Sequence, residues 1–140
     1  MTLREGLAEY YRMNPNITPP DEASEIGELF FGSHDVTHVV FGTTTQNLDE
    51  GINDMWSMWG LDISAREYLS RGLEVPEVKA LFTWANMREF ARDFLALPRY
   101  VPELWRRTRS MHKRWPWKDF EPYLDVSLAE IRREFGIEVI

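Results

Sequence analysis

The chain has 140 residues, of which 44% are hydrophobic, and its six Trp, eight Phe and five Tyr supply enough apolar material for one folded domain rather than a disordered chain. The absence of cysteine excludes disulfide scaffolds, thiolate zinc sites, iron–sulfur clusters and cysteine nucleophiles. The net charge is −7. The N-terminus lacks an apolar signal region, and no stretch approaches the roughly 18–20 apolar residues that span a bilayer. We therefore expect a cytoplasmic protein, soluble or peripheral on a membrane.

The first predicted helices surround a pair of histidines. Residues 1–20 are interpreted as an N-terminal lead-in, because prolines interrupt its second half. A helix is predicted over residues 21–31, after which the Gly-Ser pair at 32–33 interrupts it or caps a new one. A short apolar helix then follows over 34–41 and ends at Gly42.

The middle of the chain continues the helical pattern. A turn is predicted over 43–47, a helix over 48–59 and a short helix over 64–69. The longest periodic run covers 76–97, where apolar residues recur at helical spacing, and Pro98 stops it.

The last third of the chain predicts two more helices around an irregular segment. The helices cover about 100–113 and 127–135, the second opened by a capping box, and two prolines make 115–125 irregular. Only residues 36–41 and 137–140 could pass as strands. The sequence therefore predicts an all-α fold, a single compact domain of six to eight helices that covers the whole chain.

Two of the three histidines fall in the short run His-Asp-Val-Thr-His. On a helix, His34 and His38 stand about 40° apart on one face, so the two imidazoles can share one metal ion, as in HExxH sequences. Asp35 lies about 100° from His34 and borders the same face. Glu50 can supply an anionic ligand if the intervening turn folds the next helix back against the first.

Other interpretations of these residues stay open. Asp49 and Asp54 lie near Glu50 and are further candidates for the carboxylate. The two histidines could also be ordinary, partly buried side chains with Asp35 hydrogen-bonded to one of them. Asp35 replaces the Glu of HExxH, which argues against a metalloprotease base, and an HD-type phosphohydrolase needs a His upstream of His34, where the chain has none.

The segment HDVTHVVFGTTTQNLDE, residues 34–50, resembles the His-Asp-x-x-His, eleven residues, Glu signature of the Coq4 family of ubiquinone-biosynthesis proteins. SLAEIRREFGIEV near the C-terminus resembles the family's C-terminal segment, and RSMHKRWPWKDF is similar to its basic and aromatic stretch. The resemblance covers roughly residues 20–140. It departs from the family at Thr43-Thr44-Thr45, where family members often have a Leu-Pro turn.

The resemblance implies an all-α fold with an apolar groove or tunnel for a polyprenyl chain. It also implies that His34, Asp35, His38 and Glu50 are the metal ligands and catalytic residues, although Asp35 could instead orient an imidazole or handle a proton. The family's metal is usually assigned as zinc, whereas the ligand types alone also allow Fe, Mn, Co or Mg. The implied activity is oxidative decarboxylation of a polyprenylated aromatic precursor, which places a hydroxyl at ring position C1.

Two further segments suggest partners. The apolar stripe on 76–97, extended by Trp84 and Met87, is a candidate wall for the tunnel, with ordinary core as the alternative. The segment 99–118 has one acid, three Trp and seven basic residues, which suits an anionic membrane surface, or alternatively a solvated helix face. Nucleic acid is not expected, because the chain is acidic and has no binding motif. The basic residues are Arg99, Arg106, Arg107, Arg109, Lys113, Arg114 and Lys118.

Three hypotheses follow for the function. The leading one is a metal-dependent enzyme, peripheral on the inner membrane, that acts on a polyprenylated quinone precursor. Its expected partners are other quinone-biosynthesis proteins and a second copy of the chain in a homodimer. The second is a non-catalytic lipid-binding scaffold of the same complex, in which the metal is structural. The third is an unrelated metal hydrolase that turns over soluble esters or phosphates.

Overall fold

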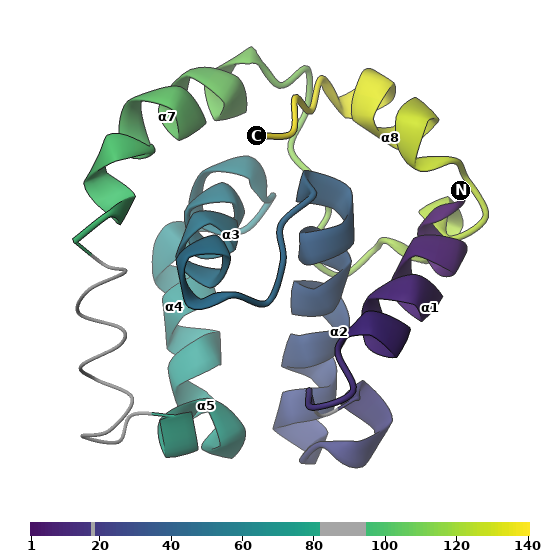
Figure 1. Ribbon diagram of the computed structural model, residues 1–140, viewed down its shortest axis with the longest axis vertical. Coiled ribbons are helices and arrows are strands. Elements are labelled where there is room, and N and C mark those ends of the chain that lie inside the picture. Colours follow the sequence, from purple (N-terminus) through teal and green to yellow (C-terminus); the bar gives the residue numbers. More distant parts are fainter. Residues whose placement is uncertain (18, 82–94) are drawn as a thin grey trace.

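Helices make up the regular structure of the protein in the computed structural model, which describes residues 1–17, 19–81 and 95–140 (Figure 1). Within those ranges the chain forms one compact all-α domain with seven α-helices and no strand, as predicted. The α-helices are α1 (Leu3–Met13), α2 (Glu25–Phe41), α3 (Asn47–Gly60), α4 (Ala65–Glu74), α5 (Pro76–Leu81), α7 (Val101–Ser110) and α8 (Leu128–Phe135), and the 3-10 helices are η1 (Pro20–Glu22), η2 (Leu97–Arg99) and η3 (Glu121–Tyr123).

Helix α2 lies at the centre of the fold, in contact with α1, α3, α4 and α8 (Figure 1). Its N-terminus is capped by the Ser24 hydroxyl, which accepts from the Gly27 N–H, and its C-terminus by Gly42 in the left-handed conformation. The predicted interruption at 32–33 is wrong, since one helix runs through it. Glycine inside a helix costs only about 1 kcal/mol relative to alanine, which the packing of α2 against four helices offsets.

Helix α1 occupies the segment that was interpreted as a lead-in. Thr2 and Glu5 form a capping box at its start, a sequence signal that was overlooked. Leu3 is fully buried, and its N–H donates to the Val126 carbonyl. The N-terminal helix is therefore part of the core and is joined to the segment that leads into α8.

Aromatic side chains fill the core on both sides of α2. Phe41 stacks on Trp56 of α3, with ring centroids 4.8 Å apart. Trp115, only 1% exposed, contacts Phe135 of α8 edge to face. Much of the segment predicted to be irregular thus supplies core contacts, although only η3 within it is helical.

The C-terminal helix α8 also stabilises the end of α2. The Arg132 guanidinium donates to the carbonyls of Val39 and Val40, at 2.9 and 3.0 Å. Because the last carbonyls of a helix lack intrahelical partners and carry partial negative charge, a cation there is favourable. Arg132 therefore connects α8 to the helix that carries the histidine pair.

The remaining predicted elements differ mainly in length. The helix predicted over 64–69 extends through Glu74, and the one predicted over 100–113 ends at Ser110. Of the run predicted over 76–97, α5 covers the beginning, whereas most of the proposed tunnel wall, with Trp84 and Met87, lies outside the described residues.

Across the described part of the chain, every helix is too short or too polar to cross a bilayer.

Candidate metal centre

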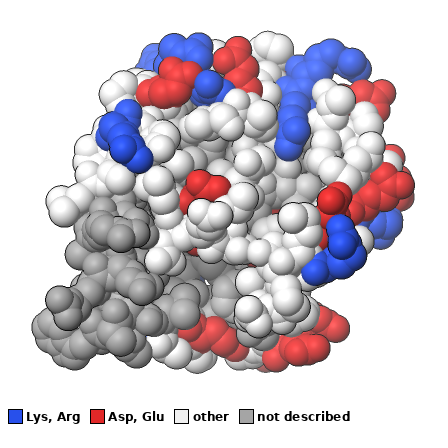
Figure 2. All heavy atoms as spheres, viewed as in Figure 1, with Lys and Arg blue, Asp and Glu red and all other residues white. Residues whose placement is uncertain are grey.

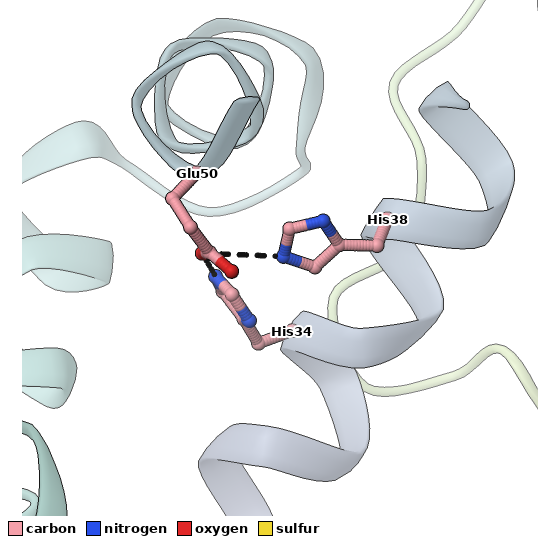
Figure 3. A group of neighbouring side chains, drawn as sticks. All are labelled: His34, His38 and Glu50. Carbon is pink, nitrogen blue, oxygen red and sulfur yellow. Dashed lines mark ion pairs between the residues drawn. The ribbon is translucent and has the colours of Figure 1, made fainter. Parts of the chain in front are cut away.

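Two adjacent helices bring the predicted histidines and Glu50 together. His34 and His38 lie one turn apart on α2, and both rings point toward Glu50 on α3 (Figure 3). One oxygen of Glu50, Oε2, lies 3.3 Å from Nε2 of His38 and 3.9 Å from Nε2 of His34. One ligand atom from each residue falls within 4.8 Å of the others, which is a spacing that a single metal ion can bridge.

A directional hydrogen-bond chain selects the tautomer of His38. The Thr37 hydroxyl donates to the His34 carbonyl at 2.6 Å, so its oxygen accepts from the Asn53 amide at 2.9 Å. This orients Asn53 so that its side-chain oxygen accepts from the Thr43 hydroxyl at 3.2 Å. The Thr43 oxygen, 3.0 Å from Nδ1 of His38, is then left to accept the Nδ1–H.

The consequence is that His38 directs a lone pair toward a carboxylate. With the proton on Nδ1, a neutral His38 carries its lone pair on Nε2, which faces Glu50. The His38 side chain is completely buried, and Nε2 has no hydrogen-bond partner among the described residues. A buried lone pair beside a carboxylate is unfavourable without a cation near both, and a metal ion would supply that charge.

His34 lies between carboxylates on both sides of its ring. Nε2 is 3.8 Å from Oδ1 of Asp54, and Nδ1 is 3.8 Å from Oδ1 of Asp35. Burial by itself lowers the pKa of His34, but Asp35, Asp54 and Glu50 outweigh it and raise the pKa to about 10. The site therefore attracts positive charge strongly when no metal is bound.

Asp35 faces the side of His34 that points away from Glu50. Its carboxylate accepts from the hydroxyls of Tyr11 at 2.9 Å and Tyr10 at 3.5 Å. Burial, and next the negative charge of Asp35, raise the pKa of both tyrosines, so they remain neutral donors. The 3.8 Å between Oδ1 of Asp35 and Nδ1 of His34 is an ion-pair distance rather than a hydrogen bond, and this placement is compatible with the second of the two roles considered for Asp35.

Aromatic rings cover the histidines. Tyr10 stacks on His38 and Phe30 stacks on His34, each with ring centroids 5.5 Å apart. The two imidazoles themselves meet edge to face at 4.8 Å. These contacts restrict the rotation of both rings and keep water from most of their surface, while Glu50 keeps one-third of its side chain exposed.

Of the spare acids, the structure brings only Asp54 beside a histidine. Asp49 instead accepts from the Thr44 backbone and hydroxyl at the start of α3. Thr37, Thr43 and Asn53 were not singled out from the sequence. Asn53 could have been, because it lies three residues after Glu50 and so shares its helix face.

A divalent metal fits the residues present. The cluster offers two imidazole nitrogens and a carboxylate oxygen, a donor set that suits zinc and also iron, manganese or cobalt. The unpartnered Nε2 of His38 is the atom that such an ion would satisfy.

A hollow of about 600 Å³ lies near the histidine cluster, between α2, α4 and residues 117–121. Its lining combines apolar and charged side chains, namely Ile26, Leu29, Phe30, Trp117 and Phe120 with Glu28, Arg71, Glu74, Lys118 and Glu121. Because the ring of Phe30 also stacks on His34, one aromatic side chain borders both the hollow and the histidine cluster.

No family model, curated protein or solved structure matches this chain. The resemblance to the Coq4 family therefore stays a prediction.

Proposed function

We propose that this protein is a metal-dependent, membrane-associated enzyme of ubiquinone biosynthesis that acts on a polyprenylated aromatic precursor. The main support for a metal is the buried Nε2 lone pair of His38, which faces the Glu50 carboxylate without a hydrogen-bond partner among the described residues. The substrate and the reaction rest on the resemblance of residues 34–50 to the Coq4 signature. The reaction would be oxidative decarboxylation at C1: the ring carboxyl group leaves as CO2, water supplies the hydroxyl that replaces it, and an external two-electron oxidant takes up the two electrons as two protons are released.

His34, His38 and Glu50 would hold the metal, which when bound supplies a Lewis acid that can hold a ring carboxylate and offset developing charge. The chain's own residues prepare the site for this. Glu50 offsets the charge of the ion, and Thr43 keeps the Nε2 lone pair of His38 available. Asp35, held by Tyr11, orients His34 from the opposite side.

The hollow beside Phe30 supports the binding of an apolar tail. Each buried CH2 group of a polyprenyl chain contributes about 0.8 kcal/mol, so even a short stretch in this hollow would add substantially to affinity. Ile26 and Leu29, which line the hollow, are 51% and 74% exposed. We propose that these two side chains continue the path of the tail toward the lipid surface.

Membrane association then depends more on apolar side chains than on the basic segment. Arg106 and Arg107 pair with Glu103, and Lys113 pairs with Glu134. Figure 2 shows cations next to acids along the upper edge of the face that it draws. Three of the seven cations of segment 99–118 are thus paired with acids within the protein, which reduces the attraction of the segment to anionic lipid.

The second candidate is a non-catalytic lipid-binding scaffold with a structural metal. Burial of the site favours it, because His38 is inaccessible and the side chain of His34 is only 12% exposed. Access for a substrate is limited to the side of Glu50 and Asp54, whose side chains are 33% and 48% exposed.

Metal analysis of protein purified without chelator, combined with mass spectrometry of co-purified lipid, tests the proposal. We expect about one divalent ion per chain and a polyprenylated aromatic compound. Glu50→Gln should lose the metal while its helical circular dichroism remains that of the metal-loaded wild type. Collapse of the fold in Glu50→Gln would instead support the scaffold, and metal no higher than trace in the wild type would refute both candidates.

A further inference from the structure

We propose that Asp54 is an additional ligand of the same metal ion, so that two histidines and two carboxylates hold it. This inference rests on the proposed function only in requiring that the site binds a divalent metal. It adds a residue that lies outside the four-residue signature and gives it a role that the signature assigns to Asp35.

The two helices present matching pairs of side chains. His34 and His38 are four residues apart on α2, and Glu50 and Asp54 are four residues apart on α3, so each pair occupies one face of its helix. Nε2 of His34 is 3.9 Å from Glu50 and 3.8 Å from Asp54. The two carboxylates therefore approach the same nitrogen from one helix at nearly equal distances.

Asp35 cannot replace Asp54 in this position without moving. Asp35 lies beside Nδ1 of His34, on the opposite side of the ring from Nε2, and two tyrosine hydroxyls bind its carboxylate. Asp54 lies beside Nε2 of His34, the nitrogen that also faces Glu50, although its oxygens stand outside the group of atoms within 4.8 Å of one another, so a small shift of its side chain would complete the site.

A buried tyrosine holds the Asp54 carboxylate toward the site. The hydroxyl of Tyr68, on α4, donates to Oδ1 of Asp54 at 2.6 Å, and Tyr68 is only 2% exposed. A carboxylate has about four acceptor positions, and this bond uses one. Tyr68 thus orients Asp54 and leaves it able to bind an ion, in the way that supporting residues orient metal ligands elsewhere.

Charge balance favours the second carboxylate. A divalent ion with two neutral imidazoles and Glu50 alone leaves one positive charge in a site where His38 is wholly buried. Asp54 makes the set of ion and ligands neutral. It also makes the site richer in oxygen, which improves the competitiveness of iron and manganese against zinc compared with a three-residue site.

Cobalt(II) and zinc are suitable probes, because the visible spectrum of bound cobalt reports its ligands and zinc affinity is measured by chelator competition. Asp54→Ala should shift the cobalt spectrum and weaken zinc binding by about 100-fold or more, beyond the roughly 10–100-fold that a supporting residue costs. Tyr68→Phe should weaken zinc binding less and leave the ligand set unchanged. Asp49→Ala is the matched control, since Asp49 lies on the same helix but contacts Thr44.

The outcomes separate the two proposals. If wild type and Asp49→Ala bind cobalt and Asp54→Ala gives the same spectrum and affinity, Asp54 is not a ligand and the metal site stands without it. If the wild type binds neither metal, the proposed function fails as well. Should circular dichroism show that Asp54→Ala is unfolded, Asp54→Asn, which retains the shape and can still accept from Tyr68, decides the question by the same spectral shift or its absence.

Discussion

The hydroxyl of Thr43 should control metal affinity although it contacts no metal. In Thr43→Val, the methyl group that replaces the hydroxyl can neither accept from Nδ1 of His38 nor donate to Asn53. His38 then loses the bond that keeps its Nε2 lone pair directed at Glu50. Loss of a bond that orients a ligand costs roughly 10–100-fold in metal affinity, or about 1.4–2.8 kcal/mol.

The same substitution should also destabilise the metal-free protein. It leaves the Nδ1–H of a fully buried His38 and the oxygen of a fully buried Asn53 each without a partner. An unsatisfied buried polar group costs about 1–3 kcal/mol, so the melting temperature should fall by several degrees.

Zinc competition with a chromophoric chelator at fixed pH measures the first effect. Thr43→Ser should retain the wild-type affinity, because it keeps the hydroxyl. Thr44→Val is the matched control, since the neighbouring hydroxyl is exposed and bonds to Asp49 and to the Gln46 N–H, away from the histidines. If folded Thr43→Val binds zinc as tightly as the wild type, the hydrogen-bond chain does not set the His38 tautomer and the reasoning is wrong.

Three further predictions concern protons and packing. Because nearby carboxylates, despite burial, raise the pKa of His34 to about 10, the metal-free protein holds a proton there at pH 7 that an incoming metal must displace. Calorimetry in buffers of different ionisation enthalpy should show about one proton released per ion, and affinity should rise about tenfold per pH unit up to the pKa; binding without proton release would contradict this. Arg132→Met should lower the free energy of unfolding in urea by about 1–3 kcal/mol, because the carbonyls of Val39 and Val40 lose a charged donor; an unchanged midpoint and slope would argue against a capping role. Trp115→Ala should cost about 3–5 kcal/mol in thermal unfolding, as for other large core truncations, and a loss below 1 kcal/mol would mean that the site is not tightly packed.

The helical pattern was predictable because it depends on local periodicity and caps. The N-cap at Ser127, whose hydroxyl accepts from the Glu130 N–H, and the left-handed Gly136 bound the last helix where the sequence predicted. The capping box of Thr2 and Glu5 is an equally clear signal for the start of α1. The break expected at Gly32 failed for another reason. A glycine weakens a helix by a small fixed amount, and only tertiary packing decides whether the helix continues.

The candidate site was predictable where helix geometry determines it. The spacing of His34 and His38 fixed their common face, and a short turn was enough to bring Glu50 to them. The role of Asp35 was open, because a position about 100° around the helix leaves its direction to the rotamer and to Tyr11, which comes from a helix that was not predicted. Thr43 was beyond prediction, since its contact depends on the path of a loop.

The bonds from Arg132 to α2 join positions 92 and 93 residues apart in the chain. During synthesis, the helix that carries both histidines is made long before the side chain that caps it. The backbone bonds of α1 to the carbonyls of Leu124 and Val126 likewise form only after those residues have been made. Contacts between such distant positions form late in folding, after the intervening chain has been made. The helix that carries both histidines therefore reaches its final, capped state only after Arg132 has been translated.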